Sequence, residues 1–186
     1  MYIIMAKKAY CNHFYGYSGY LADRMVAGGM NMKPNWKQLL LFLAIPLAVG
    51  GLGALAGGDM MEFQSLVQPP LSPPGWVFPV VWTILYLLMG YGSYRVYTSN
   101  ADPKQKRNAL ILYGAQLFFN FLWPLTFFRL GWRLTAFFLL AILWALIFLT
   151  MRAFNAIDER ASDTLLPYLL WVTFAGYLNL GVYLLN

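Results

Sequence analysis

The sequence contains few of the residues that catalytic and metal sites usually need. Its only cysteine, Cys11, and its only histidine, His13, both lie near the start of the chain. A lone cysteine cannot form an internal disulfide, and two ligands on a Tyr- and Gly-rich segment make a poor metal site. The composition therefore predicts no obligatory cofactor and no metal site, and it argues against Cys-based catalysis.

Charge is also scarce, because 11% of the residues are charged whereas 60% are hydrophobic. A soluble domain of this size could not cover its surface with so few charges. The sequence therefore predicts an all-α, multi-pass membrane protein. Its apolar runs, each long enough to cross a hydrocarbon core of roughly 30 Å, predict a five-transmembrane-helix bundle with spans at 36–56, 77–97, 109–128, 132–151 and 165–185.

Basic residues divide unequally between the two ends of this predicted bundle. From Lys33 onward, eight Lys and Arg residues lie before the first span or in the links after the second and fourth spans. Only Arg129 and Arg133 lie at the other end. By the positive-inside rule the N-terminus is cytoplasmic and the 58–76 loop lies on the far side. The positive charge thus reflects topology and contact with anionic lipid, and it predicts no nucleic-acid partner.

The first part of the chain differs from the rest in composition. Residues 1–29 are rich in Tyr and Gly and lack the continuous apolar region of a secretory signal. Met30 and Met32 stand just before the first span. We interpret 1–29 as an N-terminal extension, either disordered or a non-native leader, and 30–186 as the membrane domain.

Ionisable side chains are absent from the middle of every predicted span. Ion- and proton-coupled transporters usually hold such a group at depth, so the sequence argues against an ion-coupled device. The polar groups at depth are instead amides and hydroxyls, chiefly Gln116, Asn120, Thr173 and Asn179.

Aromatic and amide residues from three predicted spans fall at nearly the same depth. At about 1.5 Å of rise per residue, Trp82 lies roughly 8–9 Å below the face that carries the 58–76 loop. Asn120 and Asn179 lie roughly 10–13 Å below it by the same arithmetic. Helical spacing extends each position into a stripe on one helix face. The stripes are Phe78, Trp82 and Tyr86; Gln116 and Asn120; and Trp171, Ala175 and Asn179.

This coincidence predicts an aromatic-walled cavity with amide anchors beneath the loop. Such a cavity suits a flat, largely apolar ligand, because rings stack on planar surface and amides fix its orientation. In the competing interpretation, Asn120 and Asn179 only join helices, at about 0.6 kcal/mol each. Trp82 and Trp171 lie away from the membrane interface where tryptophans usually gather, which favours the cavity.

Two further features leave alternatives open. Gly50 with Ala54, and Gly53 with Gly57, are small-residue pairs that permit close helix approach, either within the bundle or between two copies of the chain. Four prolines between residues 69 and 74 stiffen the loop before the second span. That stiff loop is either a lid over the cavity or a rigid connector.

The most specific motifs of the chain are SPPGWVFPVVWTILYLLMGYGSYR at 72–95, AQLFFNFLWPLTFF at 115–128 and LLPYLLWVTFAGYLN at 165–179. In order and spacing they resemble the translocator protein family, also called tryptophan-rich sensory proteins (TspO/MBR). The resemblance covers essentially all of 36–186. It implies a homodimer of five-helix chains that binds porphyrins and haem-type tetrapyrroles, with sterol as a ligand of some members.

The resemblance also assigns roles to individual positions. Trp82 and Trp171 match tryptophans that line the family's ligand pocket. Asn120 and Asn179 match asparagines of its third and fifth helices, and Ala175 matches a small position beside the pocket.

The loop between the first two spans departs from the family pattern. Phe63 stands where many members have Tyr, and Glu62 precedes it in place of Trp. Leu71 and Ser72 replace a Trp-Thr pair. The fifth span lacks the animal-type sterol motif, so the chain resembles bacterial members and is expected in a bacterial membrane. A looser sterol-contact pattern, Leu88 to Arg95, is weak.

These observations favour an integral membrane receptor or regulator that binds protoporphyrin IX or haem-type tetrapyrroles, in tetrapyrrole homeostasis and stress sensing. One alternative is light-dependent breakdown of porphyrin, with Trp82 and Trp171 as redox-active neighbours of the ligand. Another is transport of porphyrin or sterol. The spans offer no nucleophile–base pair, so conventional catalysis is not predicted.

Overall fold

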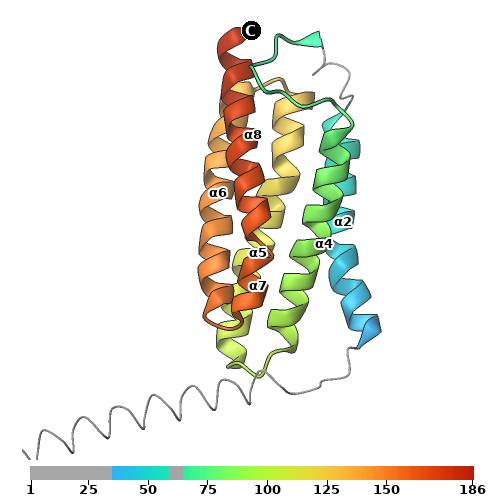
Figure 1. Ribbon diagram of the computed structural model, residues 1–186, viewed down its shortest axis with the longest axis vertical. Helices are drawn as coiled ribbons and strands as arrows, with labels where there is room; N and C mark the ends of the chain where they lie inside the picture. Colours follow the sequence, from blue (N-terminus) through green and yellow to red (C-terminus); the bar gives the residue numbers. More distant parts are fainter. Residues whose placement is uncertain (1–34, 59–64) are drawn as a thin grey trace, which may run out of the picture. The chain divides into compact units, whose positions relative to one another are not determined.

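The computed structural model describes residues 35–58 and 65–186, so the predicted extension at 1–29 and Phe63 lie outside the described residues. The described chain has five helical segments long and apolar enough to cross a membrane, as predicted. Their helices are α2 (Trp36–Gly57), α4 (Val77–Thr98), α5 (Pro103–Pro124), α6 (Arg133–Asn155) and α8 (Leu166–Leu185), as Figure 1 shows. A five-residue π-helix, η1 (Leu125–Arg129), extends α5, and the short α7 (Glu159–Asp163) precedes α8.

Local chemistry sets the ends of these helices. The Asp102 side chain accepts hydrogen bonds from the backbone N–H groups of Lys104 and Gln105, at 3.0 and 3.1 Å. Pro103 fills the first helical position, where its missing N–H costs nothing. The α5 helix therefore begins six residues before the predicted span at 109, because its first turns are polar and lie outside the apolar run. At its other end Pro124 cannot donate to the helix, and the backbone widens into η1.

The helices follow one another around the bundle in the order α4, α2, α5, α6 and α8, each packed against the next (Figure 1). The line of contact between two neighbouring helices is called a seam below. The remaining seam, α4–α8, differs because the two backbones barely approach each other. Aromatic side chains bridge it at two levels, Phe78 with Trp171 and Trp82 with Tyr168, and α7 packs against α4 at its foot.

Glycines bring α2 close to its neighbours. A Cβ added at Gly50 would overlap the Tyr86 ring. One added at Gly90 would lie 2.6 Å from the carbonyl oxygen of Phe42. Gly53 and Gly57 face Pro124 on α5 in the same way. Gly50, Gly53 and Gly57 therefore lie against neighbouring helices of the bundle, whereas Ala54 is exposed. Packing of this face between two copies of the chain stays a prediction.

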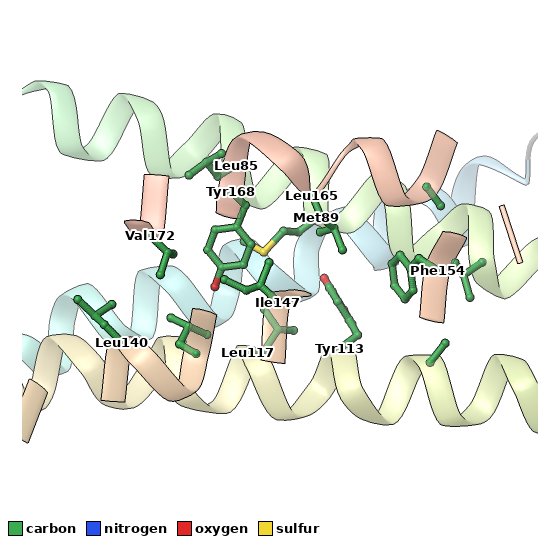
Figure 2. Packing of buried hydrophobic residues seen from close by; sticks show 14 of the residues in the cluster. Leu85, Met89, Tyr113, Leu117, Leu140, Ile147, Phe154, Leu165, Tyr168 and Val172 are labelled. Carbon is green, nitrogen blue, oxygen red and sulfur yellow. The ribbon is translucent and has the colours of Figure 1, made fainter. Parts of the chain in front are cut away.

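The core lies among α4, α5, α6 and α8, around Tyr168. Figure 2 shows Tyr168 beside Met89 of α4 and Ile147 of α6, with Leu117 of α5 nearby. These side chains are almost completely buried. Because lipid is as apolar as leucine, such packing stabilises the bundle through close van der Waals contact rather than through the hydrophobic effect.

The foot of the α4–α8 seam is held by an ion pair. Arg95 on α4 contacts Asp158 with N–O distances of 2.7 and 2.8 Å, and it also donates to the Tyr91 hydroxyl at 3.3 Å. Asp158 caps α7 by accepting from the Arg160 N–H. Two residues of the loose sterol-contact pattern, Tyr91 and Arg95, are thus already bonded to each other.

Candidate functional site

A hydrogen-bonded network joins three helices at the level of Asn120. The Tyr86 hydroxyl on α4 donates to the Asn120 carbonyl oxygen at 2.8 Å. The Asn120 amide then donates to the Tyr168 hydroxyl on α8 at 2.9 Å. Trp82 stacks on Tyr86 with ring centroids 5.4 Å apart and meets Tyr168 edge to face at 6.0 Å. Indole, phenols and amide therefore form one layer that bridges α4 and α8 through α5.

Asn179 belongs to a second network, nearer the end of α8. Its carbonyl oxygen accepts from the Trp123 indole N–H at 3.1 Å, and its amide donates to the backbone oxygen of Arg133 at 2.7 Å. It thereby joins α8 to α5 and to the start of α6. The hydrogen-bonding capacity of Asn179 is largely used in holding helices together.

A small cavity lies beside this second network. Its lining comes from three helices and η1 and includes Phe78, Trp123, Phe127, Ala175 and Asn179. Its volume is about 20 Å³, which is room for a single water molecule. Pockets for drug-sized ligands measure about 300–1,000 Å³. The sequence predicted a ligand-sized slot at this level, and the described residues enclose a far smaller space.

Phe78 of α4 lines the cavity and packs against Trp171 of α8. Their rings meet edge to face with centroids 5.9 Å apart, and Phe174 packs on Trp171 at 5.7 Å. The Trp171 indole N–H is buried and has no hydrogen-bond partner among the described residues. The hydrogen-bonding capacity of this N–H group is therefore unused.

Gln116 is the remaining predicted anchor, one turn from Asn120 on α5. Its side chain is completely buried, and neither its oxygen nor its nitrogen has a partner among the described residues. An amide buried without hydrogen bonds costs free energy on the order of 1–3 kcal/mol. Gln116 is therefore the amide in this layer with its full bonding capacity unused.

Residues 65–72, called the roof below, lie against the end of α8 (Figure 1). The Asn186 side chain accepts from the Val67 N–H at 3.0 Å and donates to the Val67 oxygen at 2.9 Å. The Tyr177 hydroxyl donates to the Pro70 oxygen at 2.8 Å. Pro69 packs on Gly181, where an added Cβ would lie 2.6 Å from it. Pro69 and Pro70 thus belong to a segment that Asn186, Tyr177 and Gly181 hold in place.

The roof also contains a strained turn. Pro69 and Ser72 are joined by a backbone hydrogen bond of 3.3 Å, and Leu71 between them has a φ of 67°. In a turn of this type that position favours glycine or asparagine.

The predicted stripes are thus brought together in two layers rather than one. Trp82, Tyr86 and Asn120 share the first layer, and Ala175 and Asn179 share the second. Phe78 and Trp171 lie where the cavity borders the α4–α8 seam. The depth arithmetic merged the layers because it assumed that all helices end at common levels, whereas α8 extends past the start of α4 (Figure 1).

Sequence reasoning did not select Tyr168 and Trp123 as site residues. Tyr168 lies on the Trp171–Ala175 stripe, one turn toward the start of α8, so the same helical spacing extended by a turn would have found it. Trp123 lies one turn beyond Asn120 on α5. No cluster of three or more potential metal ligands occurs among the described residues.

The chain matches the model of the TspO/MBR family over residues 42–184. It belongs to the TspO/MBR family. It is 39% identical to the tryptophan-rich sensory protein of Cereibacter sphaeroides over 155 residues, which cover 83% of this chain and 95% of that protein. It is 36% identical to the tryptophan-rich protein TspO of Chlorobaculum tepidum over 157 residues, covering 83% and 99%.

Animal proteins of the TspO/MBR family are similar to nearly the same degree. The translocator protein of Bos taurus is 36% identical over 154 residues, which cover 80% of this chain and 89% of that protein. The resemblance read from the three motifs is therefore confirmed, as is the assignment to an integral, multi-pass membrane protein.

Proposed function

We propose that this member of the TspO/MBR family is a membrane receptor or regulator that binds planar tetrapyrroles such as protoporphyrin IX between α4, α5 and α8. Relatives are named sensory and translocator proteins, and a receptor for a small molecule agrees with both names. The observation that carries the proposal is that aromatic rings meet across the α4–α8 seam at two levels, Trp82 with Tyr168 and Phe78 with Trp171. Aromatic side chains stack favourably on flat ligands.

Binding of a tetrapyrrole requires this region to open. A ligand of that size needs several hundred Å³, whereas the enclosed cavity holds about 20 Å³. The α4–α8 seam is the natural place for expansion, because the two backbones barely approach each other and few close backbone contacts would be broken. Trp171 and Gln116 then supply hydrogen-bonding groups that have no partner among the described residues.

A titration of the purified protein with protoporphyrin IX, followed by porphyrin absorbance, tests the proposal. Trp82→Phe and Trp171→Phe are each expected to weaken binding about 3- to 10-fold, because a good aromatic contact contributes roughly 0.5–1.5 kcal/mol. Trp36→Phe, at the exposed start of α2, is the matched control and should bind as the wild type does. Unchanged affinity in both site variants contradicts the proposed pocket.

Ala175→Leu gives a second test by filling the cavity that Ala175 lines. We expect weaker porphyrin binding with the helical bundle intact, judged by circular dichroism and size-exclusion chromatography. Wild-type affinity in a folded Ala175→Leu protein would place the ligand elsewhere.

A second candidate function is light-dependent breakdown of the bound porphyrin. The observation in its favour is the stacking of Trp82 on Tyr86, whose hydroxyl is hydrogen-bonded to Asn120. Such a pair can exchange an electron with an excited neighbour while the phenol keeps a partner for its proton. Bleaching under illumination that is absent in the dark and lost in Trp82→Phe supports this function, and equal bleaching in the variant contradicts it.

A further inference from the structure

A groove of about 400 Å³ lies along the α4–α8 seam. Ile84 on α4 and Leu170 on α8 are 53% and 62% exposed, and both lie in spans apolar enough to cross a membrane. The groove therefore faces the hydrocarbon of the bilayer. Its walls are apolar and include Val81, Ile84, Leu85, Leu170, Trp171 and Phe174.

Trp171 connects this groove with the internal cavity. It lines the groove, and its ring meets Phe78, which lines the cavity. One pair of aromatic rings thus separates a space open to lipid from a space inside the bundle. Rotation of two side chains is a smaller and faster rearrangement than separation of two packed backbones.

The route through the roof is more strongly closed. Asn186 and Tyr177 hold the roof through three hydrogen bonds to its backbone, and Pro69 packs directly on Gly181. A ligand that enters through the roof would have to break these contacts, whereas a ligand that enters through the α4–α8 groove breaks none of them.

We propose that a planar apolar molecule dissolved in the bilayer reaches the interior through the α4–α8 groove, and that the Phe78 and Trp171 rings are the partition that must open. This inference rests on the proposed function, because it names the route by which the tetrapyrrole arrives. The unpartnered Trp171 indole N–H gives the incoming molecule a hydrogen-bond donor at the partition.

Stopped-flow mixing tests the route with the full chain in lipid vesicles and protoporphyrin IX supplied from donor vesicles. Ile84→Phe places a larger side chain in the groove. It is expected to slow association and dissociation together, by about fivefold or more, with the equilibrium affinity nearly unchanged, since both directions use one path. Leu170→Phe is a second variant from the opposite wall and is expected to act alike.

Ile142→Phe is the matched control, because Ile142 on α6 is 45% exposed and does not line the groove. It should leave both rates at wild-type values. Asn186→Ala loosens the roof and should also leave the association rate unchanged. Phe78→Leu replaces one ring of the partition with a smaller side chain, so it should raise both the association and the dissociation rate.

The outcomes separate the two proposals. Saturable wild-type binding with wild-type rates in both groove variants overturns the lateral route but leaves the proposed function standing. Faster association in Asn186→Ala, with no change in the groove variants, assigns entry to the roof. Absence of saturable porphyrin binding by the wild type overturns the proposed function, and the route falls with it.

Discussion

The seams on the two sides of α4 are built in opposite ways. On the α2 side, Gly50 and Gly90 remove side chains from the contact, so that α4 and α2 lie close together. On the α8 side the backbones stay apart, and large rings fill the interval. Packed backbone cannot yield without moving a whole helix, whereas rings can rotate. The comparison therefore agrees with the proposal that the α2 side of α4 provides stability and the α8 side provides ligand access.

The largest expected effect comes from placing a side chain between α2 and α4. In Gly90→Ala the new Cβ would meet the Phe42 carbonyl oxygen and the Leu43 Cα at 2.6 and 2.8 Å. Both are backbone atoms, so α2 must shift, and we expect a loss of about 1–3 kcal/mol in unfolding free energy. Gly114→Ala is the control, since nothing lies within 4 Å of its added Cβ. Equal thermal stability of the two variants in detergent would contradict the close packing.

Asn179→Leu removes the hydrogen bonds that join α8 to α5 and α6, next to the α4–α8 seam. The Trp123 indole N–H and the Arg133 carbonyl oxygen both lose their partner. Hydrogen bonds between membrane helices average about 0.6 kcal/mol and reach about 1.7, so two of them predict a loss of roughly 1–2 kcal/mol. Chemical unfolding followed by tryptophan fluorescence measures it. A variant as stable as the wild type would show that these hydrogen bonds add nothing.

Tyr168→Phe tests the polar layer that spans the α4–α8 seam. The Asn120 amide loses its acceptor while Tyr86 keeps its own bond to Asn120. We expect a loss of about 1 kcal/mol or less. A double-mutant cycle with Tyr86→Phe should give a non-zero coupling energy, because the two phenols share one amide. Strict additivity would mean that the seam is held by ring contacts alone.

Asn186→Ala should have the smallest effect on stability, a few tenths of a kcal/mol, since its bonds to Val67 are exposed. The roof itself should become easier to cut, because its backbone loses two hydrogen bonds. Limited proteolysis near residues 65–72 detects this, and Gln105→Ala, another exposed polar truncation, is the control. Protection equal to that of the wild type would assign the roof's position to Pro69 and Tyr177.

The five-helix membrane fold was predictable from the sequence because long apolar runs leave few other structures in lipid. Every backbone group there needs an internal partner, and a helix satisfies each one within its own segment. The family was equally predictable, since its motifs are contiguous stretches such as 165–179. Helix spacing also selected most residues of the aromatic region, including Trp82, Asn120 and Trp171.

Only the tertiary structure decided how these residues meet. The hydrogen bond between Trp123 and Asn179 and the contact of Gly50 with Tyr86 both depend on the rotation and axial offset of neighbouring helices. Periodicity within one helix cannot fix these quantities, because they result from side chains packing between helices far apart in the chain. The same packing keeps the backbones of α4 and α8 apart and brings the other neighbouring helices into close contact.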